Sequence, residues 1–295
     1  MQSVIVILTL TTRNLGIKAV TFDLWETLLF ERDGDSKRRT AARCMNLARA
    51  LNRLGVKVTA EQMDSALKET ISSLLKIWDA NKDVTHLDQL RLIVKHASKG
   101  KVAMRQEWVD DLSSAYVSPI FDVPPYLNPD TRKVLAWVKN RDMRVGLICN
   151  TGLTPGSGLR KLLENEGVIH YFDLLIYSDE VGIRKPDPGI FHLAARRLGV
   201  KPCEAIHVGD NLRIDVWGAK NAGFKAIHFA SEEGRDKMAE ADPTSLVARS
   251  RNLGTLKKEQ MAPNKTITSF NMITEAIKQL VEDDPEAMAK AEDKF

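Results

Sequence analysis

Five short apolar segments, separated by stretches of helical pattern, constrain the fold of this chain more than any other feature of its sequence. The segments cover residues 18–25, 143–149, 172–177, 204–208 and 225–229. Helical stretches lie between them at 129–140, 155–166, 188–199 and 213–222. Strands that alternate with helices of this length form βαβ units and a parallel sheet. The sequence therefore predicts an α/β fold, a Rossmann-like three-layer core with a parallel sheet.

A long helical region interrupts this alternation after the first segment. Between residues 32 and 121 apolar residues recur at helical spacing, without strand-like alternation. Thr59 followed by Gln62 is a capping-box pattern that indicates one of the helix starts. The region is expected to form a bundle of four helices. We therefore predict two domains, a core made of residues 1–31 and 122–295 and an inserted helical-bundle cap at residues 32–121.

The two ends of the chain have weaker patterns. Residues 1–10 are apolar and are expected to form an extra edge strand or an N-terminal extension. Residues 266–273 have the pattern of a last strand that runs into a helix at 275–281. The charged residues 282–295 are expected to form a solvated helix or a frayed end.

Composition excludes several classes of protein. The 43 Lys and Arg residues nearly balance the 39 Asp and Glu residues, which argues against a dedicated nucleic-acid surface. The three cysteines are far apart and predict neither a disulfide framework nor a zinc cluster. No apolar run is long enough for a membrane span, and the start lacks the basic region of a signal peptide. A cytoplasmic protein that binds neither nucleic acid nor membrane is expected.

Polar residues stand at the carboxyl ends of the predicted strands, which is where open parallel sheets bind their ligands. They are Asp23, Cys149-Asn150-Thr151, Asp179-Glu180 and Gly209-Asp210, with Lys185 in a loop between strands. Any one acid at a strand end is explained more readily as a turn residue than as a catalytic group, so only their convergence indicates a site. Converging carboxylates suit Mg²⁺, which binds one or two carboxylates and leaves positions for phosphate oxygens. An aspartate can also attack phosphorus.

These motifs together resemble the haloacid dehalogenase (HAD) superfamily, in the branch with a helical cap inserted after the first strand. Residues 23–27 (DLWET) look like its first motif, DxDxT, and residues 149–151 (CNT) look like its second. Lys185 within RKPDP matches the lysine of the third motif. Gly209-Asp210 followed by Asp215 matches the fourth. The resemblance covers residues 18 to about 230.

The resemblance implies a set of metal and catalytic residues. Asp23 would be the nucleophile, and Mg²⁺ would be bound by the Asp23 carboxylate, the Trp25 backbone carbonyl and the Asp210 carboxylate. Asp215 would support this site through a second layer of contacts, and Thr27 would help shape the nucleophile loop.

On the phosphate side, Lys185 would bridge Asp23 and the substrate, beside Cys149, Asn150 and Thr151. The family's usual reaction is hydrolysis of a small phosphate monoester, so the expected partner is a small phosphorylated metabolite. A monomer or a homodimer is expected.

The sequence departs from the family's phosphatases at two positions. They carry a second aspartate two residues after the nucleophile, which protonates the leaving alkoxide, whereas this chain has Trp25. Glu26 is adjacent, but on an extended backbone its side chain should point to the other side. Cys149 stands where a Ser or Thr hydroxyl is usual, and a thiol is a weak hydrogen-bond donor.

Two other functions stay open. In the family's 2-haloacid dehalogenases the nucleophile attacks carbon, no metal is needed and an arginine near the cap receives halide. The candidates for that arginine are Arg32, Arg38, Arg39 and Arg43, which otherwise form a solvated basic helix face. The dehalogenases lack an acid at the Asp210 position and have a tyrosine where this chain has Phe191, so phosphate is preferred over halide. A weakly active relative that binds a phosphorylated ligand or a protein partner is the third possibility.

Overall fold

The computed structural model describes residues 16–231 and 256–282 and contains a parallel sheet between two layers of helices. The order across the sheet is β5-β4-β1-β6-β7-β8, and every neighbouring pair is parallel. The strands are β1 (Ala19–Phe22), β4 (Arg144–Cys149), β5 (Leu174–Tyr177), β6 (Ala205–Gly209), β7 (Lys225–Phe229) and β8 (Lys265–Ile267). Since β1 lies between β4 and β6, the end of the first strand is at the centre of the sheet.

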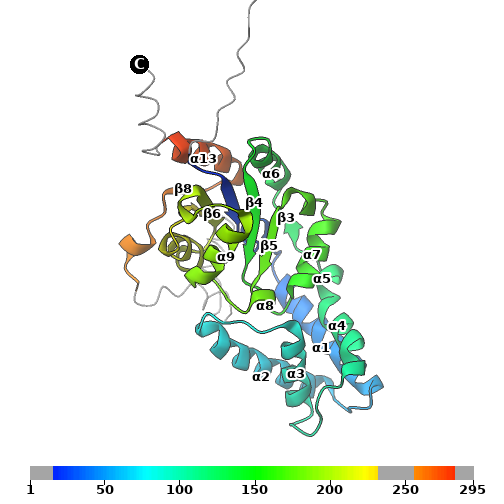
Figure 1. Ribbon diagram of the computed structural model, residues 1–295. Helices are drawn as coiled ribbons and strands as arrows, with labels where there is room; N and C mark the ends of the chain where they lie inside the picture. Colours follow the sequence, from blue (N-terminus) through cyan, green and yellow to red (C-terminus); the bar gives the residue numbers. More distant parts are fainter. Residues whose placement is uncertain (1–15, 232–255, 283–295) are drawn as a thin grey trace, which may run out of the picture.

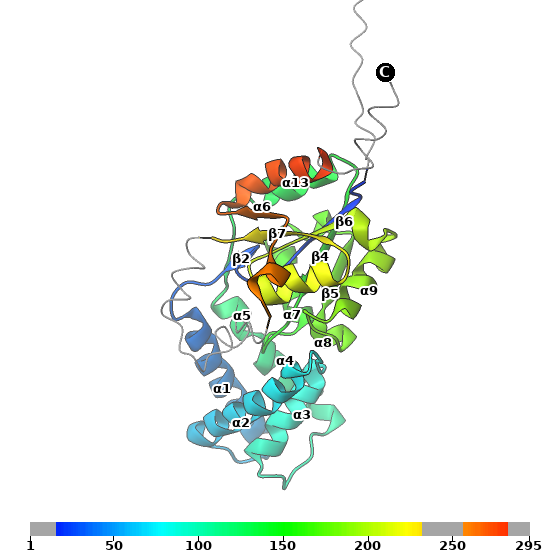
Figure 2. The same cartoon turned by 90° about the vertical axis from the view of Figure 1, so that its left-hand side faces the viewer.

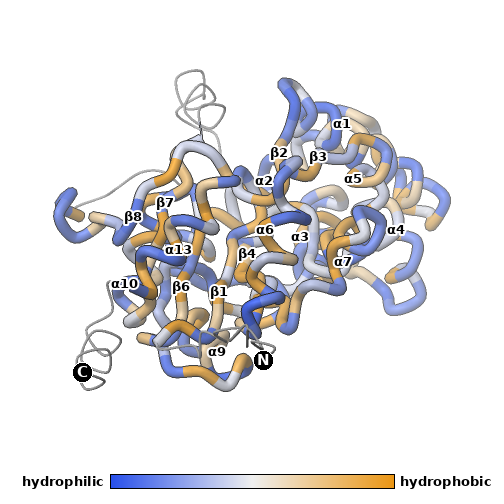
Figure 3. Tube along the Cα trace, turned by 90° about the horizontal axis from the view of Figure 1, so that it is seen from above, coloured by the Kyte–Doolittle hydropathy of each residue, from blue (hydrophilic) through white to orange (hydrophobic). Residues whose placement is uncertain are grey.

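Helices cover both faces of this sheet (Figure 1). One hydrophobic cluster joins one face of the strands to α6 (Thr131–Lys139), α7 (Gly156–Asn165) and α13 (Ile273–Glu282). A second cluster joins the opposite face to α9 (Pro188–Leu198) and α10 (Gly218–Asn221). In Figure 3 apolar residues follow β6 and β7 inside the molecule, whereas the outer loops are hydrophilic. The predicted three-layer α/β core is confirmed.

Two helix starts differ from the sequence expectation because polar side chains form local turns first. α6 begins at Thr131 rather than at residue 129, since Asn128 Oδ1 accepts a hydrogen bond from the Asp130 N–H at 3.0 Å. The helix expected at 213–222 instead opens with a π-helical segment, Leu212–Trp217, which continues as α10. The remaining short elements are α8 (Ser178–Val181) and single 3₁₀ turns at Gln106–Trp108, Ile169–Tyr171, Pro202–Glu204, Lys258–Met261 and Phe270–Met272.

The inserted region forms a separate helical layer over the carboxyl ends of the strands (Figure 1 and Figure 2). It contains four helices, α1 (Asp35–Arg53), α2 (Ala60–Asp79), α3 (His86–Ala97) and α4 (Val109–Val117), which share their own hydrophobic cluster. The capping box of Thr59 and Gln62 is present at the start of α2. A fifth short helix, α5 (Pro119–Asp122), packs Ile120 into the cluster of the sheet. The domain limits at residues 31/32 and 121/122 stay a prediction.

The two connections between cap and core are tied to each other. Strand β2 (Leu29–Phe30) enters the cap, β3 (Tyr126–Leu127) leaves it, and the two pair in an antiparallel ribbon. The rings of Phe30 and Tyr126 stack with their centroids 5.8 Å apart. This ribbon fixes where the cap joins the sheet.

The expectations for the chain ends have different outcomes. The last strand and helix exist as β8 and α13. The edge strand expected at residues 1–10 and the helix or frayed end expected at 283–295 lie outside the described residues. Within the described ranges, no helix has both the length and the apolar character needed to cross a membrane.

Candidate active site

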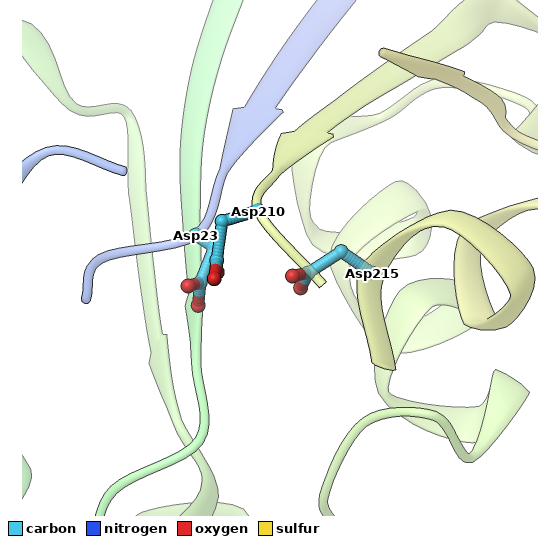
Figure 4. Close-up of side chains that lie close together, drawn as sticks. All are labelled: Asp23, Asp210 and Asp215. Atoms are coloured by element: carbon cyan, nitrogen blue, oxygen red, sulfur yellow. The ribbon is translucent and has the colours of Figure 1, made fainter. Parts of the chain in front are cut away.

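Three carboxylates meet at the carboxyl end of the sheet. Asp23 follows β1, Asp210 follows β6, and Asp215 reaches them from the π-helical segment (Figure 4). One oxygen of each carboxylate lies within 4.8 Å of one oxygen of each of the others. β1 and β6 are neighbours in the sheet, which is why residues 187 positions apart come together. Carboxylate oxygens at this spacing fit a hard divalent cation such as Mg²⁺.

A glycine and an asparagine allow Asp215 to approach the strand end. A Cβ atom on Gly209 would lie 2.4 Å from Asp215 Cγ, so a side chain at residue 209 would displace this carboxylate. Asn211 Oδ1 accepts hydrogen bonds from the N–H groups of Arg213 and Ile214 and thereby starts the π-helical segment. The Asn211 N–H donates in turn to Asp215 Oδ2 at 3.0 Å.

Lys185 lies between two of these carboxylates. Its Nζ donates to Asp23 Oδ1 at 2.5 Å and to Asp215 Oδ1 at 2.6 Å. Burial alone would lower the pKa of Lys185, but the two carboxylates outweigh it and raise this pKa above its usual value. The lysine is therefore a permanently charged ammonium group beside the predicted nucleophile.

The two acids respond differently to the same surroundings. Burial raises the pKa of Asp23 to about 6, and Asp215 repels its charge, while Lys185 acts in the opposite direction. Burial also opposes ionisation of Asp215, but Lys185 and a hydrogen bond from His207 hold the pKa of Asp215 well below its usual range. Asp215 is therefore ionised at neutral pH. The raised pKa of Asp23 means that its ionised form is held less firmly, and a cation bound beside Asp23 would favour that form.

His207, a buried histidine of β6, orients Asp215. Its Nε2 is 3.2 Å from Asp215 Oδ1, and its Nδ1 is 2.9 Å from Thr21 Oγ1. Burial lowers the pKa of His207 to about 4, so the ring is neutral near pH 7. A neutral ring next to a carboxylate donates from Nε2, and Nδ1 then accepts from the Thr21 hydroxyl.

Asn150 holds the lysine loop in place. Its Nδ2 donates to the Lys185 carbonyl oxygen and its Oδ1 accepts from the Lys185 N–H, both at 2.8 Å. The side chain predicted to contact phosphate is thus bonded on both sides to the backbone of the residue that carries the ammonium group. Asn150 also lines the cavity.

The cap completes the site through Asp83, a residue of the loop between α2 and α3. Its buried carboxylate accepts hydrogen bonds from Ser178 Oγ at 2.6 Å, from Arg184 Nη1 at 2.5 Å and from Thr151 Oγ1 at 3.4 Å. Trp78 Nε1 donates to its other oxygen at 2.8 Å. The Thr151 hydroxyl, predicted to bind phosphate, is therefore directed toward the cap loop.

Backbone hydrogen bonds reinforce this contact between cap and core. The Asp83 N–H donates to the Gly182 carbonyl at 3.1 Å, and the Arg184 N–H donates to the Asn81 carbonyl at 3.0 Å. Sequence inspection did not identify Asp83 or Arg184, because each belongs to a loop with ordinary turn composition. The RK pair at residues 184–185 was the only signal in the sequence, and only its lysine was assigned.

A cavity of about 390 Å³ lies between cap and core and is lined by residues of both. The core contributes the strand-end residues Asp23, Asn150, Thr151, Lys185, Asp210 and Asp215. The cap contributes residues from α1 and α2, among them Arg39, Arg43 and Trp78. A cavity of this size fits a small ligand. Asp179, at the end of β5, does not line it and instead accepts hydrogen bonds from the Gly156 N–H.

The loop after β1, which follows the predicted nucleophile Asp23, is bent where an extended backbone was expected. Glu26 has φ 55°, in the left-handed region, and it lines the cavity. The extended backbone expected at Glu26 is therefore wrong, because the loop turns back through hydrogen bonds from the Leu28 and Leu29 N–H groups to the Leu24 carbonyl. Trp25 also lines the cavity. The Trp25 backbone carbonyl as a metal ligand stays a prediction.

Two predicted site residues are buried away from the cavity. The Cys149 side chain is fully buried in the hydrophobic cluster of the sheet, and burial together with Asp23 raises the pKa of its thiol well above the usual value. A protonated, buried thiol is not a reactive group. Thr27 is also fully buried, within the bent loop, which is compatible with its predicted role in shaping that loop.

The basic residues in and just before α1 do not form the solvated face expected for them. Arg32 and Arg38 are exposed, but Arg39 and Arg43 are buried and line the cavity. Arg39 pairs with Glu31, and its Nη1 donates to the Val123 carbonyl at 3.0 Å. The residue spacing along the helix explains the split, since positions 39 and 43 lie one turn apart on the face turned to the core.

Comparison with other proteins identifies a matching family and several relatives of this chain. A family model described as haloacid dehalogenase-like hydrolase matches residues 17–223. A glyceraldehyde 3-phosphate phosphatase of Methanopyrus kandleri is 31% identical over 223 residues, which cover 75% of this chain and 87% of that protein. A protein of the same name from Pyrococcus furiosus is 33% identical over 217 residues, covering 72% of this chain and 80% of its own length.

Solved structures share the fold. The crystal structure of a 2-haloacid dehalogenase from Pseudomonas syringae superposes with a TM-score of 0.61, covering 90% of this chain and 99% of that chain. Its sequence identity to this chain is 24%, so the likeness is one of fold alone.

Proposed function

Since the chain belongs to the family of haloacid dehalogenase-like hydrolases, we propose that it hydrolyses a small organic phosphate ester with Asp23 as the nucleophile and Mg²⁺ as the cofactor. The observation that carries the proposal is the meeting of Asp23, Asp210 and Asp215 in the cavity between cap and core, with Lys185 bonded to Asp23 and Asp215. Asp23 and Asp210, with Asp215 beside them, are the residues that would hold the metal. When bound, Mg²⁺ would neutralise charge on the phosphate oxygens.

The proposed reaction has two steps. In the first, an Asp23 carboxylate oxygen forms a bond to phosphorus while the bond from phosphorus to the ester oxygen breaks, and the alkoxide takes up one proton from solvent water and leaves as an alcohol. In the second, water attacks the phosphorus of the aspartyl-phosphate, which releases inorganic phosphate and restores the Asp23 carboxylate. Lys185 offsets the negative charge that gathers beside Asp23 in both steps.

Activity is expected to require a divalent cation. EDTA should abolish phosphate release, and added Mg²⁺ should restore it, because three carboxylates in one cluster repel the incoming phosphate unless their charge is compensated. The measurement is phosphate release with EDTA and with Mg²⁺. Asp210→Asn, which keeps the shape and removes the charge, should show the same loss. Undiminished turnover in EDTA would contradict the metal assignment.

Substrates should be tested as a panel of small sugar, triose and acid phosphates, with p-nitrophenyl phosphate as a reference ester. Glyceraldehyde 3-phosphate comes first, because the two relatives named above are glyceraldehyde 3-phosphate phosphatases and the match spans most of their length. The size of the cavity favours esters of a few carbon atoms. Failure to hydrolyse any ester, together with Mg²⁺-dependent binding of one, would favour a ligand-binding protein instead.

The absence of an acid at residue 25 predicts slow turnover on poor leaving groups. Trp25→Asp is expected to raise kcat at least tenfold on an alkyl ester such as glycerol 3-phosphate, since general acid catalysis contributes about 10²–10⁴-fold. On p-nitrophenyl phosphate, whose leaving group needs no proton, kcat should change little. Steady-state kinetics on the two esters make the comparison.

Trp25→Asn is the matched control, because it removes the same ring but donates no comparable proton. Equal gains in the two variants would attribute the effect to space rather than to acid catalysis. Glu26→Gln tests the other carboxyl group of the loop, which lines the cavity. A loss confined to alkyl esters in this variant would identify Glu26 as the group that already supplies the proton.

A dehalogenase is the less favoured function. Asp210 is present beside Asp23, as a metal-dependent reaction requires. Phe191 is fully buried under the sheet, with its ring centroid 5.1 Å from that of His207, and does not line the cavity. Release of halide from 2-chloropropionate in EDTA would overturn the preference for phosphate esters.

A further inference from the structure

Among the residues that the structure describes, one buried cation of the cavity lacks the negative partner that its neighbours have. Arg43, on helix α1, is only 2% exposed and lines the cavity. The other buried or nearly buried basic side chains of the cavity each pair with a carboxylate: Lys185 with Asp23, Arg184 with Asp83, and Arg39 with Glu31. Arg43 forms no such pair with any residue that the structure describes.

Within residues 16–231 and 256–282, the polar and ring contacts of Arg43 are with neutral groups. Its Nε donates to the Tyr116 carbonyl oxygen at 2.9 Å, and its Nη2 donates to Thr154 Oγ1 at 3.3 Å. The Tyr116 ring centroid lies 5.0 Å from the Arg43 Cζ. These contacts hold the guanidinium in position and use only part of its five N–H groups.

A guanidinium in this state is ready to accept an anion. Burial of a charge is costly unless an opposite charge compensates it, so buried arginines are normally paired. The planar N–H fork of arginine fits the two oxygens of a carboxylate or phosphate. Because the side chain faces a ligand cavity, a negative group on the ligand can provide the missing compensation.

Arg43 is also placed to distinguish the two ends of a substrate. It comes from the cap, whereas the phosphate-reacting groups Asp23 and Lys185 come from the strand ends of the core. Thr154, its hydrogen-bond partner, belongs to the loop that begins at Asn150, so the arginine stands at the contact between cap and core. Both sets of groups line the same cavity.

We infer that Arg43 binds a second anionic group of the substrate, so that the preferred substrates are small phosphate esters that also carry a carboxylate or a second phosphate. The inference rests on the proposed function, because it takes one end of the ligand to be the phosphate that reacts at Asp23. Arg43 would select the substrate and take no part in the proton or phosphoryl transfers.

Matched esters test the inference with the unaltered protein. 3-Phosphoglycerate and glycerol 3-phosphate differ in having a carboxylate or a hydroxymethyl group at the far end. We expect the KM of the wild-type protein to be at least tenfold lower for 3-phosphoglycerate. Propane-1,3-diol bisphosphate compared with 3-hydroxypropyl phosphate shows whether a second phosphate serves instead of a carboxylate. Equal KM values within both pairs would overturn the inference.

Substitution identifies the residue. Arg43→Met should raise the KM for the doubly charged ester at least tenfold, leave its kcat within about twofold, and leave the KM for the neutral ester nearly unchanged. Arg43→Lys retains the charge and should therefore retain part of the KM difference between the two esters. This variant keeps the test valid if Met disturbs the packing of α1. Arg38→Met, an exposed arginine of the same helix, is the matched control and should change neither KM. Equal KM increases for both esters would contradict a binding role.

Binding measurements separate this inference from the proposed function. Calorimetric titration of the Asp23→Asn protein with 3-phosphoglycerate and with glycerol 3-phosphate requires no turnover. Tighter binding of 3-phosphoglycerate, lost in the Asp23→Asn/Arg43→Met protein, supports the anion site even if no ester is hydrolysed. Hydrolysis that depends on Mg²⁺ and Asp23, without any preference for the second charge in kinetics or binding, would leave the proposed function standing and refute the role of Arg43.

Discussion

Asp23→Asn should reduce phosphate release by about 10⁴-fold or more, since loss of a nucleophile removes the covalent route altogether. The substitution replaces one carboxylate oxygen by an amide nitrogen of similar size. Lys185 keeps Asp215 as a charged partner at 2.6 Å, so the buried ammonium is not left without compensation. The protein should therefore fold normally while losing activity. Initial rates on the preferred ester of the panel give the measurement.

Two controls make the result specific to the nucleophile. The variant should have a melting temperature close to that of the wild type, and it should still bind the ester. Incubation of the wild-type protein with ester, followed by acid quenching and mass analysis of the peptide that contains residue 23, should show added phosphate, absent in the variant. Turnover by Asp23→Asn within tenfold of the wild type would refute the assignment of the nucleophile.

The sequence was sufficient to predict that Asp23 and Asp210 lie close together, because the order and direction of the strands fix where these two residues stand. Once β1, β4 and β6 are recognised as parallel strands, their carboxyl ends must lie at one edge of the sheet, and Asp23 and Asp210 come with them. Lys185 was also expected near these strand ends, but only the resemblance to a family paired it with Asp23, since nothing local shows that a loop residue at 185 returns to that carboxylate. The structure places its Nζ 2.5 Å from that carboxylate.

The errors arose where backbone bends or tertiary contacts override local pattern. Glu26 was expected on an extended backbone, but the loop after β1 turns back on itself and brings Glu26 to the cavity. Arg39 and Arg43 were expected in a solvated charged face, because a run of basic residues does not show which of them face the core. Asp83 went unnoticed because its partner Arg184 is 101 residues away, and no local periodicity connects the two.

Asp83→Ala should be the most destabilising single substitution in the contact between cap and core. Removing one partner of a buried ion pair typically costs about 3–5 kcal/mol, because the other charge stays buried without compensation. Here Arg184, whose side chain is 12% exposed, would lose its carboxylate partner, and Ser178 and Trp78 would each lose an acceptor. A denaturant titration that reports the free energy of unfolding provides the measurement.

Asp83→Ala should also lower kcat, and a paired substitution can separate this effect from the loss of stability. The carboxylate orients Thr151, and it fixes Arg184, the residue directly before Lys185. Misplacement of such groups by about 1 Å can cost on the order of 10²-fold in rate. In the double variant Asp83→Leu/Arg184→Met no charge is left unpaired, so much of the lost stability should return. If Asp83 positions the site, kcat should stay low in that variant although the fold has recovered. If kcat recovers together with stability, Asp83 only holds the cap on the core, and the positions of Thr151 and Lys185 do not depend on it.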